Sequence, residues 1–87
     1  MICVLATIEV APGRRNEFLT VFAALAPQVR AEAGCIEYQA MIDLPNSVPG
    51  QTPARADVVT VVEKWESVAA LEAHLMAPHM QQFRRST

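Results

Sequence analysis

The chain has 87 residues, 52% of them hydrophobic and 18% charged, and a formal net charge of −2 at pH 7. This composition excludes a disordered chain, and a domain of this length buries only a modest core, so we expect a partner to add stability. The apolar runs are too short to span a bilayer, and the basic residues are too few to neutralise a run of phosphates. We therefore expect one domain over residues 1–87, with no membrane or nucleic-acid partner.

The N-terminal segment predicts a strand from Ile2 to Val10. Met1 leads directly into it, without the charged and apolar regions of a signal peptide, so we expect a cytoplasmic protein. Alternate residues point to opposite sides of a strand, and both sides here are fairly apolar. One side carries Ile2, Val4, Ala6, Ile8 and Val10, and the other carries Cys3, Leu5, Thr7 and Glu9.

A helix is predicted from Arg14 onward, because apolar residues recur every three or four positions and so share one helical stripe. The stripe consists of Phe18, Phe22, Leu25 and Val29. Pro27 lies inside it and lacks a backbone donor, so we expect a kink or an early end near Ala26. Gly34 is expected to stop the helix.

Two more strands are predicted, with a long loop between them. The first runs from Cys35 to Asp43 and the second from Ala56 to Trp65. The intervening segment, Leu44 to Arg55, is rich in proline and predicts a loop. In the first of these strands, Ile36, Tyr38, Ala40 and Ile42 are expected on one face and Cys35, Glu37, Gln39 and Met41 on the other.

A second helix is predicted after Ser67, whose hydroxyl can accept a hydrogen bond from a free amide of the first turn. Its expected core stripe consists of Val68, Leu71 and Leu75. Pro78 should end or bend this helix. Residues 79–85 can add another turn around Met80 and Phe83.

The order strand, helix, strand, strand, helix indicates an α+β, ferredoxin-like domain, with an antiparallel sheet that carries helices on one face. Both faces of the sheet are apolar. One face carries Val58, Val62, Leu5, Met41 and Cys3, and the opposite face carries Val59, Val61, Ile8 and Ile36. We therefore expect a homodimer that stacks two sheets back to back. A ferredoxin-like sheet has a fourth strand, but only residues 84–87 follow Phe83, so that strand is missing from this sequence.

The segment from Glu63 to Met80 contains the only two histidines, His74 and His79. Histidine is the side chain that exchanges protons near neutral pH, so any chemistry is expected here. On a helical wheel His74 falls at the edge of the predicted core stripe. A metal site built from both histidines and Glu63 is not expected, because Pro78 interrupts the helical spacing that would align them.

The pattern of residues resembles the antibiotic biosynthesis monooxygenase family, whose members include cofactor-independent quinol monooxygenases. The matching positions are Val10, Pro12, Gly13, Glu17, Phe18, Arg30, Glu32, Gly34, Cys35, Glu37, Tyr38, Glu63, Trp65, Ser67, Leu71, His74, Pro78 and His79. The resemblance implies a dimeric α/β barrel with a pocket between sheet and helices in each protomer.

The resemblance further implies a small quinol or polycyclic phenol and O2 as substrates, with no cofactor and no metal. We predict His74 as the general base, because deprotonation makes the ring electron-rich enough to react with O2 directly. Trp65 is predicted to stack on the substrate. The remaining predicted substrate contacts are Tyr38, Glu63, His79 and Phe83.

Each of these residues also has a plain structural interpretation. His74 can be hydrogen-bonded at the core boundary, Trp65 and Tyr38 can be packing residues, Glu63 can form an ion pair, and His79 can lie at a helix start or an interface. Two other functions remain open. One is an isomerase of a small keto compound that uses the same histidine, and the other is a non-catalytic dimeric module.

Overall fold

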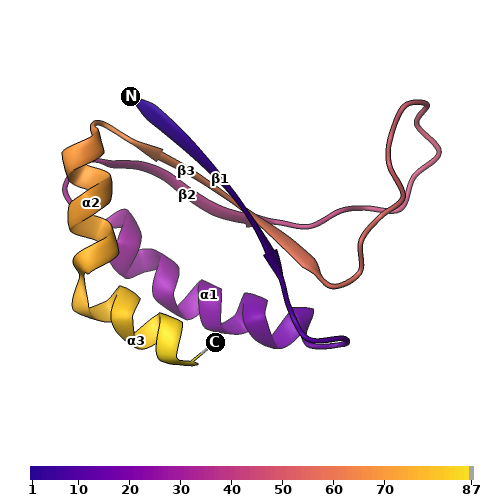
Figure 1. Cartoon of the computed structure of the whole chain (residues 1–87), viewed down its shortest axis with the longest axis horizontal. Helices are drawn as coiled ribbons and strands as arrows, with labels where there is room; N and C mark the ends of the chain where they lie inside the picture. The colour runs from indigo at the N-terminus through magenta and orange to yellow at the C-terminus, as the bar shows by residue number, and fades with distance from the viewer. Residues whose placement is uncertain (87) are drawn as a thin grey trace.

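The computed structural model describes residues 1–86 as a three-stranded antiparallel sheet with three helices on one side (Figure 1). The elements in chain order are β1 (Ile2–Glu9), α1 (Arg15–Arg30), β2 (Cys35–Met41), β3 (Val58–Trp65), α2 (Val68–Met76) and α3 (Pro78–Ser86). The sheet order is β1-β3-β2, so β3 is central. The predicted α+β fold is confirmed, and residues 1–86 contain no fourth strand. No helix among them is long and apolar enough to cross a membrane.

The core lies between the sheet and α1, and it uses the side chains that the helical periodicity predicted. Val59, Val61 and Trp65 point from the central strand toward the helices and are buried. The stripe of α1 packs against them, and all four of its members are buried: Phe18, Phe22, Leu25 and Val29.

The early end of α1 near Ala26 and the stop at Gly34 are both wrong as predictions. The helix does not end near Ala26 but continues through Pro27 to Arg30. Pro27 is exposed, as is Ala23 one turn earlier, so water can bind the carbonyl that Pro27 leaves without a donor. Gly34 does not stop the helix either, because it lies in the turn that follows.

The turn between α1 and β2 needs glycine at position 34. Its φ is +83°, and a Cβ there would lie 2.6 Å from the Cβ of Ala70 on α2. The carbonyl of Gly34 accepts the amide of Glu66 at 2.8 Å, which ties the turn to the end of β3. Gly34 thus lets the turn, β3 and α2 approach closely.

The predicted faces of β2 are wrong at its start. The register shifts between Cys35 and Glu37, so Ile36 is an extra residue in the pairing with β3. Ile36 is therefore exposed rather than on the same face as Tyr38, and Cys35 lies opposite Trp65. A bulge of this kind cannot be seen in an alternating pattern.

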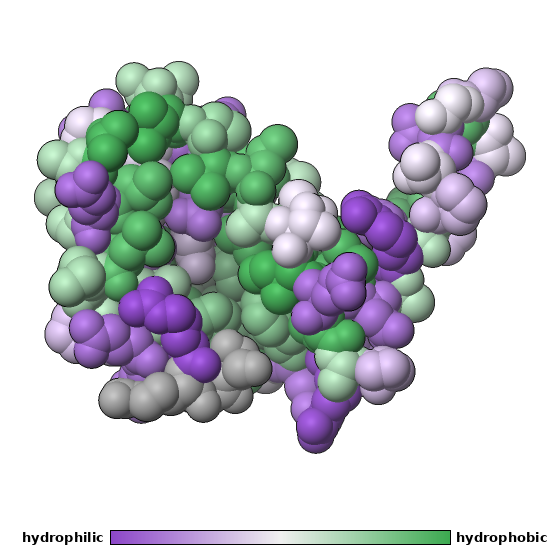
Figure 2. Space-filling view, viewed as in Figure 1, coloured by the Kyte–Doolittle hydropathy of each residue, from purple (hydrophilic) through white to green (hydrophobic). Residues whose placement is uncertain are grey.

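The N-cap of α2 is as predicted, since the Ser67 hydroxyl accepts the amide of Ala70 at 3.2 Å. The predicted core stripe holds only for Leu71, which packs against the core. Val68 and Leu75 are exposed, and His74 is the buried residue of the helix. Every residue of α2 except Glu72 and His74 is apolar, so periodicity could not identify the face that packs. Exposed apolar side chains of α2 contribute to the hydrophobic surface in Figure 2.

The predicted loop is confirmed as a protruding segment without helix or strand between β2 and β3 (Figure 1). At its base, the guanidinium of Arg55 contacts the carboxylate of Asp43 at 2.7 and 3.1 Å. This contact lowers the pKa of Asp43 to about 2. The loop is therefore closed at its neck, and its surface is mainly polar toward the tip (Figure 2).

Candidate active site

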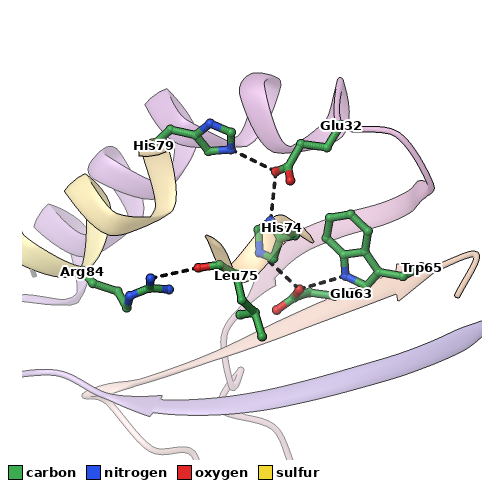
Figure 3. A network of polar contacts seen from close by, with 7 residues as sticks. All are labelled: Glu32, Glu63, Trp65, His74, Leu75, His79 and Arg84. Atoms are coloured by element: carbon green, nitrogen blue, oxygen red, sulfur yellow. Dashed lines mark hydrogen bonds and ion pairs between the residues drawn. The ribbon is translucent and has the colours of Figure 1, made fainter. Parts of the chain in front are cut away.

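A buried polar cluster lies where α2, α3 and the turn after α1 meet β3 (Figure 3). His74 is at its centre and only 1% of its side chain is exposed. Its Nδ1 lies 2.9 Å from Oε2 of Glu32, and its Nε2 lies 3.8 Å from Oε1 of Glu63. Nε2 of His79 contacts the same Glu32 oxygen at 2.9 Å. One imidazole is thus enclosed by two carboxylates, and one carboxylate is shared by two imidazoles.

The backbone brings these groups together from distant parts of the chain. Glu32 lies in the turn after α1, where its carbonyl accepts the amide of Cys35 at 3.2 Å. His74 lies in the last turn of α2, and His79 lies in the first turn of α3, directly after Pro78. Arg84 donates to the carbonyl of Leu75 at 2.9 Å, which ties α3 to the end of α2 (Figure 3).

Glu63 is positioned by its own strand. Residues two apart on a strand point to the same side, so Glu63 and Trp65 both face the helices. The indole Nε1 of Trp65 donates to Oε1 of Glu63 at 3.0 Å, and Trp65 itself is fully buried. The carboxylate is therefore fixed beside His74 by a rigid neighbour (Figure 3).

The hydrogen bonds indicate where the ring protons are. An ionised carboxylate can only accept, so Oε2 of Glu32 receives Nδ1–H from His74 and Nε2–H from His79. Nε2 of a neutral His74 then carries the lone pair and faces Glu63. A proton taken up at Nε2 would give an imidazolium with a carboxylate at each nitrogen. The arrangement therefore suits His74 to accept a proton at Nε2.

Tyr38 packs against the other side of the cluster. Its ring meets the imidazole of His74 edge-on at 5.7 Å and stacks on Phe22 at 4.8 Å. Burial raises the pKa of the Tyr38 hydroxyl well above its usual value, and the carboxylates of Glu63 and Glu32 raise it further. Tyr38 is thus held in its neutral form, in which its hydroxyl can donate a hydrogen bond.

The structure brings together five of the six predicted site residues, His74, Trp65, Tyr38, Glu63 and His79. Phe83 lies apart, in a groove of about 450 Å³ between the end of β1, the start of α1 and α3. His74 is not among the residues that line this groove. Rings connect the two regions, because Phe83 contacts Phe18, Phe18 contacts Phe22, and Phe22 stacks on Tyr38.

Glu32 is the site residue that sequence reasoning missed. It appeared only as one position of the family pattern, and no periodic or motif signal places it beside a histidine. The expectation that Pro78 keeps the histidines apart is also wrong. Pro78 does end the helical spacing, but the turn into α3 returns His79 to the same carboxylate that His74 contacts.

Comparisons with known proteins agree on one family. Residues 1–86 match the sequence model of the family described as antibiotic biosynthesis monooxygenase. A relative from Escherichia coli (strain K12), named "Probable quinol monooxygenase YgiN", is 41% identical over 85 residues, which are 95% of this chain and 81% of the relative. The crystal structure of PA3566 from Pseudomonas aeruginosa has a TM-score of 0.76 and 31% identity, and the match covers 95% of this chain and 75% of that chain.

Tyr38 gives a prediction for alkaline pH. Because its pKa is raised in the folded protein, the unfolded chain loses this proton first, and stability should fall as pH rises above about 10. The loss should approach about 1.4 kcal/mol per pH unit, measured by urea unfolding, and it should be smaller in Tyr38→Phe. Tyr38 is the only tyrosine, so phenolate absorbance of the folded protein at an ordinary pKa would contradict this.

Proposed function

The chain belongs to the antibiotic biosynthesis monooxygenase family, and on that premise we propose that it oxidises a small quinol or polycyclic phenol with O2. The name of the Escherichia coli relative supports this substrate class. The observation that carries the proposal is the geometry of His74. Its Nδ1 is committed to Glu32 at 2.9 Å, so Nε2 is the atom left to take the substrate proton.

In this proposal Glu63 is the group that the substrate hydroxyl meets first. Its side chain is 12% exposed, whereas that of His74 is 1% exposed. The phenol donates to the Glu63 carboxylate, and its proton comes to rest on Nε2 of His74. An ordinary phenol and an ordinary imidazole differ in proton affinity by about 5 kcal/mol, so the transfer needs help. The carboxylates of Glu32 and Glu63 contribute to it, because both lie beside the imidazolium that forms.

The deprotonated ring then reacts with O2 without a flavin or a metal. It gives one electron to O2, and the resulting radical pair joins to form a carbon–oxygen bond. The peroxide anion takes back the proton held on Nε2 of His74 and becomes a hydroperoxide. Loss of water then leaves a hydroxylated quinone from a quinol, or a quinone from a phenol, so one oxygen atom enters the ring and the other leaves as water. Trp65 is fully buried and so presents no free ring face for the predicted stacking on the substrate. It instead serves the proton transfer by holding Glu63 in place through the 3.0 Å hydrogen bond.

We also propose that the protein is a homodimer that pairs the sheet faces opposite the helices. Leu5 on β1 is 68% exposed on that face, and Met41 on β2 is exposed on the same face across the central strand. An isolated three-stranded sheet that leaves such residues in water buries little apolar surface for its length. Stacking two sheets about 10 Å apart would cover them.

The proposed reaction predicts O2 consumption by metal-free protein with a panel of hydroquinones and dihydroxynaphthalenes. His74→Asn, which keeps most of the buried volume, should lower kcat by about 10²–10⁴-fold, because it removes the proton acceptor. Glu72→Gln is the matched control, since Glu72 is exposed on the same helix, and its kcat should stay at the wild-type value. Unchanged turnover in His74→Asn would contradict the role of His74. No uptake with any substrate would favour the isomerase or the non-catalytic module.

The proposed dimer predicts a molar mass by light scattering of twice that of the 9.5 kDa chain. Leu5→Glu should halve this mass, because two buried carboxylates would face each other across the interface. Val68→Glu is the control, since Val68 is also exposed and apolar but lies on α2. A monomeric wild type, or a Leu5→Glu variant that stays dimeric, would refute this interface.

A further inference from the structure

We propose that Glu32, His74 and His79 form a binding site for a divalent transition metal such as Zn²⁺. One carboxylate oxygen and two imidazole nitrogens lie within 4.8 Å of one another. They come from three elements that are distant in sequence: the turn after α1, the end of α2 and the start of α3. The inference rests on this geometry and not on the proposed reaction.

The spacing of the three atoms fits a single ion. Two ligands of a tetrahedral Zn²⁺, each about 2.0–2.1 Å from the metal, lie about 3.3 Å apart. In the structure, Nδ1 of His74 and Nε2 of His79 each lie 2.9 Å from Oε2 of Glu32. The two contacts to Glu32 would therefore have to lengthen by a few tenths of an ångström. The two imidazole nitrogens, which lie within 4.8 Å of each other, would have to take the same spacing of about 3.3 Å, and rotation of the partly exposed His79 can supply this.

The donor set selects the class of metal. Two imidazole nitrogens and one carboxylate oxygen are borderline ligands that favour Zn²⁺ and its neighbours in the first transition row. Mg²⁺ and Ca²⁺ prefer six or more oxygen ligands, which this cluster does not offer. We therefore expect Zn²⁺ and Co²⁺ to bind and Mg²⁺ not to compete.

The surroundings of His74 are those of a metal-ligating histidine. Such a histidine usually donates its second ring N–H to a carboxylate, which fixes the ring and its tautomer. Nε2 of His74 faces Oε1 of Glu63 at 3.8 Å, and that oxygen is already held by the indole of Trp65 at 3.0 Å (Figure 3). A carboxylate therefore stands on the Nε2 side of the ring, and shortening of this 3.8 Å contact would complete the outer support for a metal at Nδ1.

An ion can reach the cluster from the side of α3. The side chains of His79 and Glu32 are 25% and 16% exposed, whereas that of His74 is 1% exposed. The ion would meet His79 and Glu32 first and then His74 behind them. Three protein ligands leave a tetrahedral ion one further position, which water can fill from the exposed side.

Metal binding would reverse the tautomer of His74. In the metal-free site Nδ1 carries a proton for Glu32 and Nε2 carries the lone pair. A metal at Nδ1 displaces that proton and places the remaining one on Nε2, where it points at Glu63. His74 could then no longer accept a proton at Nε2, so Zn²⁺ should inhibit the reaction; this consequence alone rests on the proposed function.

The test is metal binding by the full chain without a polyhistidine tag. Co²⁺ should give the visible absorption of a low-symmetry site, and Zn²⁺ should abolish it at one equivalent. Calorimetry with Zn²⁺ should show one site per chain, with affinity at least about tenfold lower in His79→Asn and in Glu32→Gln. Glu37→Gln, on the opposite face of the sheet, and Cys3→Ser, which removes an exposed thiol, are controls that should bind like wild type.

Folding is checked on the same variants. His79 is partly exposed and Gln retains an acceptor oxygen at position 32, so both site variants should keep the wild-type circular dichroism. Zn²⁺ at about 100 times its Kd should raise the Tm of wild type by roughly 10–20 °C and leave that of His79→Asn nearly unchanged. Absence of Zn²⁺ binding by wild type, or equal binding by all variants, would overturn the site.

Inhibition separates this inference from the proposed function. Zn²⁺ should reduce O2 uptake in proportion to the occupancy measured by calorimetry. Binding without inhibition would support the metal site and contradict Nε2 of His74 as the proton acceptor. O2 uptake in a protein that binds no Zn²⁺ would overturn the metal site and leave the proposed reaction standing.

Discussion

The carboxylate of Glu32, shared by two imidazoles, is the interaction on which the candidate site depends. A buried imidazole is costly unless its nitrogens find partners, and Glu32 provides one for His74 and one for His79. It also joins the turn after α1 to both C-terminal helices. The approach of that turn requires Gly34, whose missing side chain leaves room for Ala70. The close approach of the turn to α2 at Gly34 is therefore what allows Glu32 to reach both histidines.

In the two proposals, a proton and a metal ion compete for Nδ1 of His74. With a proton at Nδ1 of His74, the ring has a basic nitrogen facing Glu63. With a metal at Nδ1, the ring faces Glu63 with an N–H instead. The indole of Trp65 supports both states, because it fixes Glu63 in either case. The chemistry of the site is then decided by which species occupies the space beside Glu32.

Local signals in the sequence predicted much of the fold. The stripe on α1, the Ser67 cap and the loop before β3 follow from residues close together in the chain, and each is present. The errors arose where distant segments decide the outcome. Ile36 does not lie on its expected face because of a bulge in the pairing with β3. The packing face of α2 carries Ala70 and His74, which meet Gly34 and Glu32, residues distant in sequence. The shared role of Glu32 depends on contacts across more than 40 residues, which no spacing rule contains.

His74 presents Nε2 as its basic atom because Nδ1 donates to Glu32. Long-range ¹H–¹⁵N NMR of the metal-free protein tests this directly, since the chain has only two histidines and their nitrogens can be assigned with His79→Asn. We expect that Nδ1 of His74 carries a proton, whether or not Nε2 does. A neutral ring with its proton on Nε2 would contradict it.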